Sequence, residues 1–364
     1  MAFPALLLIC VFLIALLPYI PATYEWLRPT DVAPLPVRRN EINNLRYFAD
    51  SFRQRITAIP EINLSGLRNL QTDRTVSSND NLNIVHQRLG ADASASYYPE
   101  TLKMLQKKNV IVIFVHDARL PPGSHNQADL FAASDLSVGA GASLRACSAQ
   151  GVITLGANTV VHRWIDAPCI HVGSNASIDG RITALKEINF ADGSQFVRAG
   201  APSMRFGACD AASAAAEALP EMSPSWATRT RQILDDGAEA SSDIYQNGDF
   251  VVRGAYRVLA GTTLFGSIKT YGDLYLGQHS RIVGSIVSNK DIVLAKGCSV
   301  LGPVISQNDI VIGADCRIGA PGAATTVICR KLTIAAGCVV HGVITTQDGA
   351  TVTTVTTAEI PDAA

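Results

Sequence analysis

The sequence has few charged and few aromatic side chains for its length. Of 364 residues, 17% are charged and 6% are aromatic, and the formal net charge is −1. A near-neutral chain lacks the basic surface that nucleic-acid binding requires, so we expect no nucleic-acid partner. A rod that binds glycans needs rows of exposed aromatic rings, and Trp164 is the one tryptophan in the repeats described below.

Sequence motifs for catalysis, cofactors and metals are also missing. The chain has no GxSxG motif, no P-loop and no GxGxxG motif that follows a predicted strand. It has no CxxC pair and no Cys/His spacing of a zinc site. We therefore expect a protein that is not an enzyme, with no cofactor and with no catalytic, cofactor-binding or metal-binding residues.

What the sequence does contain is a nine-fold repeat that keeps four columns in step. The units start at Leu136, Ile153, Ile170, Ile188, Tyr256, Leu274, Ile292, Ile310 and Leu332. Large apolar residues stand two and eight positions after each start. The fifth column reads Gly141, Asn158, Asn175, Gly193, Gly261, His279, Gly297, Asp315 and Gly337. The sixth column is small: Ala142, Thr159, Ala176, Ser194, Thr262, Ser280, Cys298, Cys316 and Cys338. Self-similarity at a fixed period indicates a repeat architecture.

The repeat predicts a parallel β-helix. Unit spacings are 17, 17 and 18 residues in the first block and 18, 18, 18 and 22 in the second. Apolar and polar residues alternate over short runs, as they do in strands. The fifth column holds residue types that tolerate positive φ and so suits corners. We expect a mainly β fold of about nine three-stranded coils, because a β-sandwich has no reason to keep the columns in step.

The cysteines are interpreted as packing groups. The eight are Cys10, Cys147, Cys169, Cys209, Cys298, Cys316, Cys329 and Cys338. Three of them share the sixth column with Ala, Ser and Thr, where a free cysteine acts as a small buried apolar residue. A disulfide between stacked strands remains the alternative in an oxidising compartment, whereas reduced cysteines suit the cytosolic side of a membrane.

The N-terminus is predicted to be a membrane anchor. Residues 2–19 are almost wholly apolar, and residues 1–23 are long enough to span a bilayer. No basic residue precedes Phe3, which disfavours a signal peptide, although Ala22 could serve a cleavage site. Arg28, Arg38 and Arg39 lie downstream and favour a cytosolic C-terminal portion. We expect a single-pass protein of the bacterial inner membrane whose bulk is cytoplasmic.

Between this anchor and the repeats, two regions are expected. Residues 24–60 begin with a Pro-rich spacer and continue as an amphipathic helix, with apolar residues at Ile42, Leu45, Phe48, Phe52 and Ile56. This helix could lie on an anionic membrane or pack on its own domain. Residues 61–130 are interpreted as a small α/β region that caps the rod or docks a partner, with a buried strand at residues 110–115.

The repeats fall into two segments, at residues 131–207 and 248–356, followed by a tail at residues 357–364. Residues 208–247 interrupt the register with two predicted helices, the second at residues 225–234. The interruption is either an insertion in one rod or a linker between two β-helices. We favour one rod, since the columns resume with the same chemistry.

Two groups of polar residues, the histidines and a row of aspartates, could suggest a site. His116–Asp117 follows the predicted strand, and His162 and His171 lie on neighbouring coils in different columns. His279 takes a corner position. Asp249, Asp273, Asp291 and Asp309 form a ladder that resembles the aspartates of calcium-binding solenoids, but it lacks their GGxGxD corner. Aspartates that open a strand after a turn explain the ladder more simply.

A short motif, apolar-x-Gly-x-aliphatic, recurs in five coils at residues 178–182, 264–268, 282–286, 300–304 and 340–344. In this motif the chain resembles the bactofilins, bacterial polymer-forming cytoskeletal proteins, over residues 131–207 and 248–350. The resemblance implies a right-handed, three-sided β-helix that assembles end to end with itself. It also implies a scaffold role at the membrane, with envelope or polysaccharide synthesis proteins as possible partners. The anchor, residues 24–130 and the interruption depart from the family's pattern.

Two other functions remain alternatives. Residues 310–319 look like a fragment of a hexapeptide-repeat acyltransferase. Those enzymes keep a strict six-residue period and use a loop histidine as general base, whereas residues 208–247 contain no histidine. An exported β-helix that binds cell-wall glycans is the third possibility.

Overall fold

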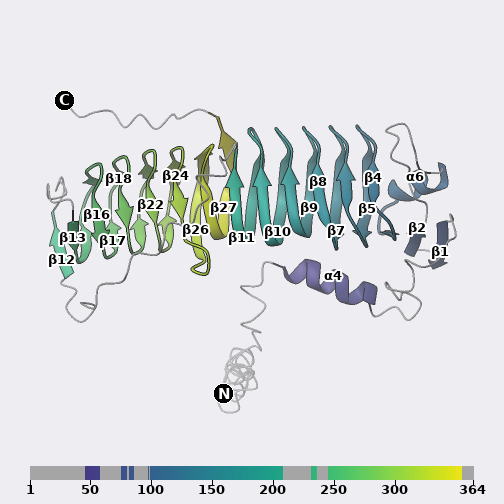
Figure 1. Ribbon diagram of the computed structural model, residues 1–364, viewed down its shortest axis with the longest axis horizontal. Coiled ribbons are helices and arrows are strands. Elements are labelled where there is room, and N and C mark those ends of the chain that lie inside the picture. Colours follow the sequence, from purple (N-terminus) through teal and green to yellow (C-terminus); the bar gives the residue numbers. More distant parts are fainter. Residues whose placement is uncertain are drawn as a thin grey trace, which may run out of the picture. The chain divides into compact units, whose positions relative to one another are not determined.

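The fold is a β-solenoid of about 12 turns, with two helices in the described part of the chain (Figure 1). This computed structural model describes residues 46–57, 75–79, 82–85, 97, 99–207, 231–235 and 245–354. The described residues from Phe48 onward belong to one compact unit. Within these residues no helix is long and apolar enough to cross a membrane. The anchor predicted at residues 1–23 and the tail at residues 357–364 lie outside them.

The first segment stacks strands in parallel. Its strands are β3 (Ile111–Phe114), β4 (Ala118–Leu120), β5 (His125–Ala132), β6 (Leu136–Val138), β7 (Ser143–Ala149), β8 (Val152–Leu155), β9 (Val160–Val172), β10 (Ser177–Phe190) and β11 (Gln195–Phe206). Its N-terminal end carries the antiparallel pair β1 (Thr75–Asn79) and β2 (Leu82–Val85), with β2 parallel to β3, and helix α6 (Pro99–Leu105). Residues 61–130 therefore contain the predicted buried strand as well as the first coil.

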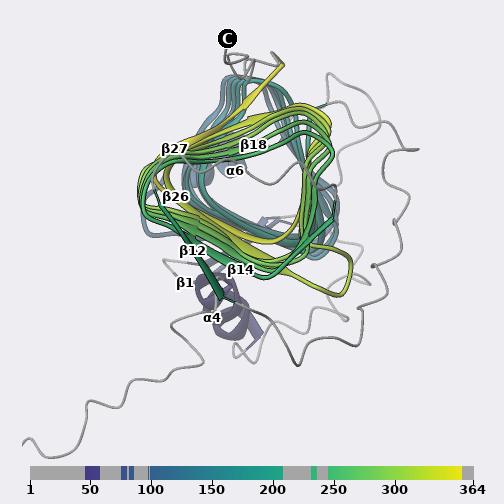
Figure 2. The same cartoon turned by 90° about the vertical axis from the view of Figure 1, so that its left-hand side faces the viewer.

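The second segment repeats three strands a turn. Its strands are β12 (Arg231–Leu234), β13 (Tyr245–Asn247), β14 (Asp249–Val252), β15 (Tyr256–Val258), β16 (Thr263–Phe265), β17 (Ile268–Thr270), β18 (Leu274–Leu276), β19 (Arg281–Ile282), β20 (Ile286–Ser288), β21 (Ile292–Leu294), β22 (Ser299–Val300), β23 (Val304–Ser306), β24 (Asp309–Ile312), β25 (Arg317–Ile318), β26 (Thr325–Ala335) and β27 (Val339–Thr353). Each strand from β14 to β22 pairs in parallel with the third strand after it. Three stacks result, and Figure 2 shows the turns superimposed along the axis.

The columns read from the sequence are confirmed. All nine residues of the fifth column have positive φ, from 54° at Asn175 to 83° at Gly337. The second, sixth and eighth columns are buried throughout, with exposures of 4% or less. Each buried aliphatic side chain contributes about 1.5–3 kcal/mol by leaving water, so the stacked columns form the core.

The predicted coil number, nine, is too low. Three further starts align with the first column: Ala118 pairs with Leu136, Met204 with Ile188 and Ala350 with Leu332. Eight positions after Ala118 the apolar column is broken by Asn126, which is nevertheless buried because its amide donates to Ser124 Oγ at 3.0 Å. After Met204 and Ala350, the sequence does not continue the later columns.

The recurring glycine has a steric cause. A Cβ built on Gly266, Gly284 or Gly302 would overlap the carbonyl oxygen of the equivalent residue one coil earlier: Gly248, Gly266 or Gly284. Backbones of successive coils approach too closely there for any side chain. The motif therefore marks a line of close contact along the second segment.

One predicted helix is wrong in its described part. Residues 225–234 were expected to be helical, but Arg231–Leu234 is strand β12, parallel to β14 with Arg231 opposite Asp249. The ladder of backbone hydrogen bonds outweighs the local helix propensity. Residues 208–230 and 236–244 lie outside the described residues.

Candidate functional site

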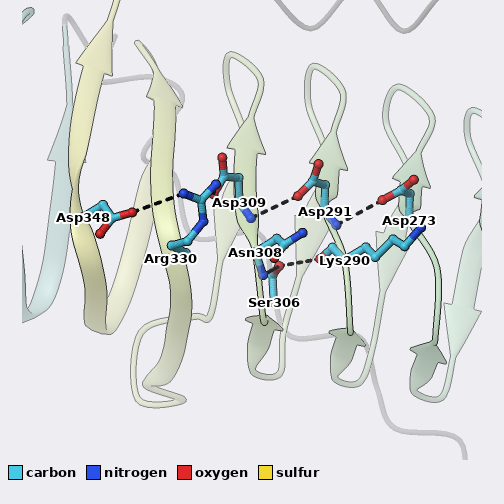
Figure 3. A network of polar contacts seen from close by, with 8 residues as sticks. All are labelled: Asp273, Lys290, Asp291, Ser306, Asn308, Asp309, Arg330 and Asp348. Carbon is cyan, nitrogen blue, oxygen red and sulfur yellow. Dashed lines mark hydrogen bonds and ion pairs between the residues drawn. The ribbon is translucent and has the colours of Figure 1, made fainter.

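The aspartate ladder is a set of backbone caps. Asp273 accepts the N–H of Asp291 at 3.2 Å, and Asp291 accepts the N–H of Asp309 at 3.1 Å (Figure 3). Arg330 ends the ladder, since its guanidinium lies 2.8 Å from Asp309 and 3.3 Å from Asp348. In the part of the chain that the structure describes, no three His, Cys, Asp or Glu side chains gather as a metal site. The carboxylates hold successive coils together.

A parallel row of hydroxyl contacts supports the same turns. Ser306 Oγ donates to the carbonyl oxygen of Lys290 at 2.5 Å and accepts the N–H of Asn308 at 2.9 Å (Figure 3). One coil earlier, Ser288 Oγ accepts the N–H of Lys290 at 2.9 Å. These serines satisfy turn groups that would otherwise lack partners.

One histidine joins three coils in the order of a catalytic triad. Ser143 Oγ lies 3.0 Å from His162 Nε2, and His162 Nδ1 lies 3.1 Å from Asp179. A hydrolase also needs N–H donors aimed at the oxyanion. The N–H of Ser143 instead donates to Ser124 O at 2.8 Å. His162 is 54% exposed, and the row ties three successive coils together.

The other predicted histidines are not brought together. Asp117, next to His116, accepts the N–H of Asp135 at 3.4 Å, as a turn residue does. His171 contacts Asn189 at 3.2 Å on the next coil. His279 has φ 56° and occupies the corner that its column predicted.

The sixth-column cysteines act as weak hydrogen-bond donors. Cys298 Sγ donates to Gly277 O at 3.1 Å and Cys338 Sγ to Gly313 O at 3.0 Å. Ser280 Oγ makes the equivalent contact to Leu259 O at 2.9 Å. A hydrogen bond with Cys316, and then burial, raise the pKa of the Cys298 thiol well above its usual range. All six described cysteines are free thiols.

The two segments meet through their last coils. Strand β11 runs antiparallel to β27, with Ala199 opposite Ile344 and Met204 opposite Val340, whereas successive coils within each segment pair in parallel (Figure 1). Both segments therefore end at one shared junction, which we call the tail-to-tail junction. This differs from the single rod with an insertion that the resuming columns favoured.

Side chains reinforce the tail-to-tail junction. His341 Nδ1 lies 2.7 Å from Pro202 O, and Thr346 Oγ1 donates to Val197 O at 2.8 Å. The core just behind it holds Phe190, Phe196 and Phe206, whose stacked ring centroids are 4.5–6.1 Å apart. Aromatic stacking adds about 0.5–1.5 kcal/mol per pair beyond burial. Nothing in the sequence periodicity marks these residues as a junction.

Strand β12 lies at the opposite end of the second segment. In the described ranges it pairs only with β14. Ile233 on β12 is 64% exposed. An open edge carries N–H and C=O groups able to pair with another chain.

Helix α4 (Tyr47–Thr57) is clamped to the outside of the first segment. Phe52 contacts Trp164 edge-on at 5.1 Å between ring centroids. Arg53 lies 2.7 Å from Asp166, which is fully buried, and also donates to Ser148 Oγ and Ala149 O, each at 3.1 Å. Of the two sequence alternatives for this helix, its described part packs on its own domain.

Asp166 was not predicted from the sequence as the buried partner of Arg53. Its signal is a lone carboxylate inside the apolar run Trp164–Ile165–Asp166–Ala167, since a buried charge needs a partner.

No protein-family model, no curated protein and no solved structure matches this chain, so the bactofilin resemblance stays a prediction.

Proposed function

We propose that this chain is a membrane-anchored β-helical scaffold of the bactofilin type, with a right-handed coil, that assembles end to end with copies of itself. It works on the cytoplasmic side of the bacterial inner membrane and organises envelope or polysaccharide synthesis. The aspartate ladder and the rows through His162 and His171 support this choice over catalysis, because these side chains bond neighbouring coils.

The observation that carries the proposal is the tail-to-tail junction. There the terminal coil of one β-helix is covered by the terminal coil of another through a run of antiparallel pairs. The same chemistry is available to the edge of β12, which has β14 as its one strand partner in the described ranges, when it meets a second copy. Two copies related by a two-fold axis would present identical edges to each other.

The test is electron microscopy and sedimentation velocity of the full-length protein in a mild detergent over a range of concentrations. We expect particles that lengthen along the solenoid axis as concentration rises. Ile233→Lys should prevent lengthening, because a charge on an edge strand opposes pairing. The control is Ile328→Lys, on β26 of the same segment, where the side chain is 40% exposed.

Single particles of constant length at the highest concentration would refute self-assembly. Equal effects of both lysine variants would refute assembly through the β12 edge. A periplasm-specific reporter that is active at the C-terminus would overturn the cytoplasmic placement.

A further inference from the structure

Three arginines gather on the outside of the first segment, next to α4. Arg163, Arg181 and Arg198 come from the successive strands β9, β10 and β11. They line a pocket of about 330 Å³ together with Phe48, Trp164 and Asp179. We call this the arginine pocket. Phe48, which belongs to α4, lies 4.9 Å from the Arg181 guanidinium.

Two of the positive charges of this pocket lie opposite each other on neighbouring strands. Arg181 and Arg198 are direct partners in the β10–β11 register, about 4.8 Å apart along the stack. Like charges that lie opposite each other destabilise a sheet. Across the described ranges, none of the three arginines forms an ion pair with a carboxylate.

The one acidic group in the pocket is already engaged. Asp179 lies 3.1 Å from His162 and accepts a hydrogen bond from Ser177 Oγ at 2.9 Å. Burial, and then the neighbouring charge of Arg198, lower the pKa of Arg181. The stack thus carries an electrostatic cost that a bound anion would remove.

Arginines in other coils of the solenoid have carboxylate partners. Arg145, one coil before Arg163, lies 3.5 Å from Asp129, and Arg330 lies between Asp309 and Asp348. The sheet that carries the arginine pocket therefore has carboxylates available to arginine in other coils. The lack of one at Arg181 and Arg198 points to a ligand that brings the negative charge.

We propose that the arginine pocket binds a phosphate group. Guanidinium groups recognise phosphate with paired hydrogen bonds, and three of them suit a doubly charged phosphomonoester. The rings of Phe48 and Trp164 give the pocket an apolar wall for the organic part of the ligand. Either an anionic lipid headgroup or a soluble phosphate compound has this chemistry. The inference does not depend on self-assembly.

The experiment is titration calorimetry of the full-length protein in a non-ionic detergent. One arm uses inorganic phosphate and the other uses a short-chain phosphatidic acid, both at constant ionic strength. The pocket variant is Arg181→Gln with Arg198→Gln. The matched control is Arg257→Gln with Arg281→Gln, which removes the same charge from the second segment.

We expect the pocket variant to weaken binding about tenfold or more, because it removes the charge-assisted hydrogen bonds of two guanidinium groups to the phosphate. The control variant should bind as the unchanged protein does. Pocket-dependent binding in both arms identifies a phosphate site open to soluble ligands, and binding of phosphatidic acid alone identifies a lipid headgroup site.

No binding in either arm overturns the proposal, and so does equal weakening by the control. Arg198→Lys is the control for misfolding, because it keeps the charge of an exposed side chain and loses only the paired hydrogen bonds of the guanidinium. It should weaken binding less than Arg198→Gln does. Equal effects of these two single variants would contradict recognition by guanidinium groups.

Discussion

Replacing Arg53 with Met should release helix α4 from the solenoid. The variant removes the guanidinium that lies 2.7 Å from the fully buried Asp166, while the Thr183 hydroxyl still donates to this carboxylate at 2.7 Å. Removing one partner of a buried ion pair costs about 3–5 kcal/mol. The Arg53 side chain is 26% exposed, so solvent already screens part of the pair, and we take about 3 kcal/mol.

This cost is comparable to the free energy that the buried side chains of α4 contribute to its docking. Phe52 and Ile56 are the large buried side chains of α4, and each contributes about 2 kcal/mol by burial. A loss of about 3 kcal/mol therefore shifts the local equilibrium of α4 strongly towards the undocked state. The coils themselves keep their columns and their backbone ladder, so we expect the main melting transition to change little.

Hydrogen exchange read by mass spectrometry tests this reasoning. Peptides that cover residues 47–57 should lose about a hundredfold in protection, because 1.4 kcal/mol corresponds to a factor of ten. Adding Asp166→Asn to Arg53→Met removes the buried charge and should restore much of the protection. Arg55→Met, on the exposed side of the same helix, is the control. Unchanged exchange in Arg53→Met, or the same change in Arg55→Met, would refute the clamp.

Three further predictions concern the coils. Val300→Asp should destabilise the second segment by at least about 4 kcal/mol in a denaturant melt, because it buries a carboxylate in the apolar column; Ser299→Asp, one residue away on the outer face, should cost under about 1 kcal/mol. Gly284→Ala should lower the melting temperature, since its Cβ overlaps a carbonyl oxygen of the preceding coil, at a cost of about 1–3 kcal/mol; an unchanged melt would contradict the close contact. At about pH 8, iodoacetamide should leave Cys329 unmodified in the native protein, because burial raises the pKa of its thiol to about 12. Half-buried Cys169 should react first among the six described cysteines, and peptide mass spectrometry reads both.

Local chemistry explains why the coils could be predicted from the sequence. A corner at positive φ accepts few residue types. Asn158, His279 and Asp315 therefore indicate positive φ at their positions, although none of them is glycine. An inward position is apolar in one coil because it touches the same position in the next. Both constraints repeat with each turn, and a periodic search detects them.

The tail-to-tail junction could not be predicted in the same way. The second β-helix could continue the stacking direction of the first, or it could run in the opposite direction and meet the first end to end. Both arrangements bury the same columns and form the same corners. The direction of stacking depends on which coil covers the last strand, and that choice is made by pairs such as Ala199 and Ile344, far apart in sequence. The docking of α4 is also non-local, because Arg53 and Asp166 meet across more than a hundred residues.

The tail-to-tail junction also limits how copies can associate. Because β11 and β27 cover each other, the described chain has two remaining ends, and they are unlike. At the first, β2 adds to β3 and β1 adds to β2 as a hairpin. At the second, β12 presents a strand edge with the exposed Ile233. Isologous pairing of β12 with its counterpart buries the apolar edge of both copies, so the first product should be a two-fold dimer. Sedimentation that passes directly from monomer to long filaments would contradict this order of assembly.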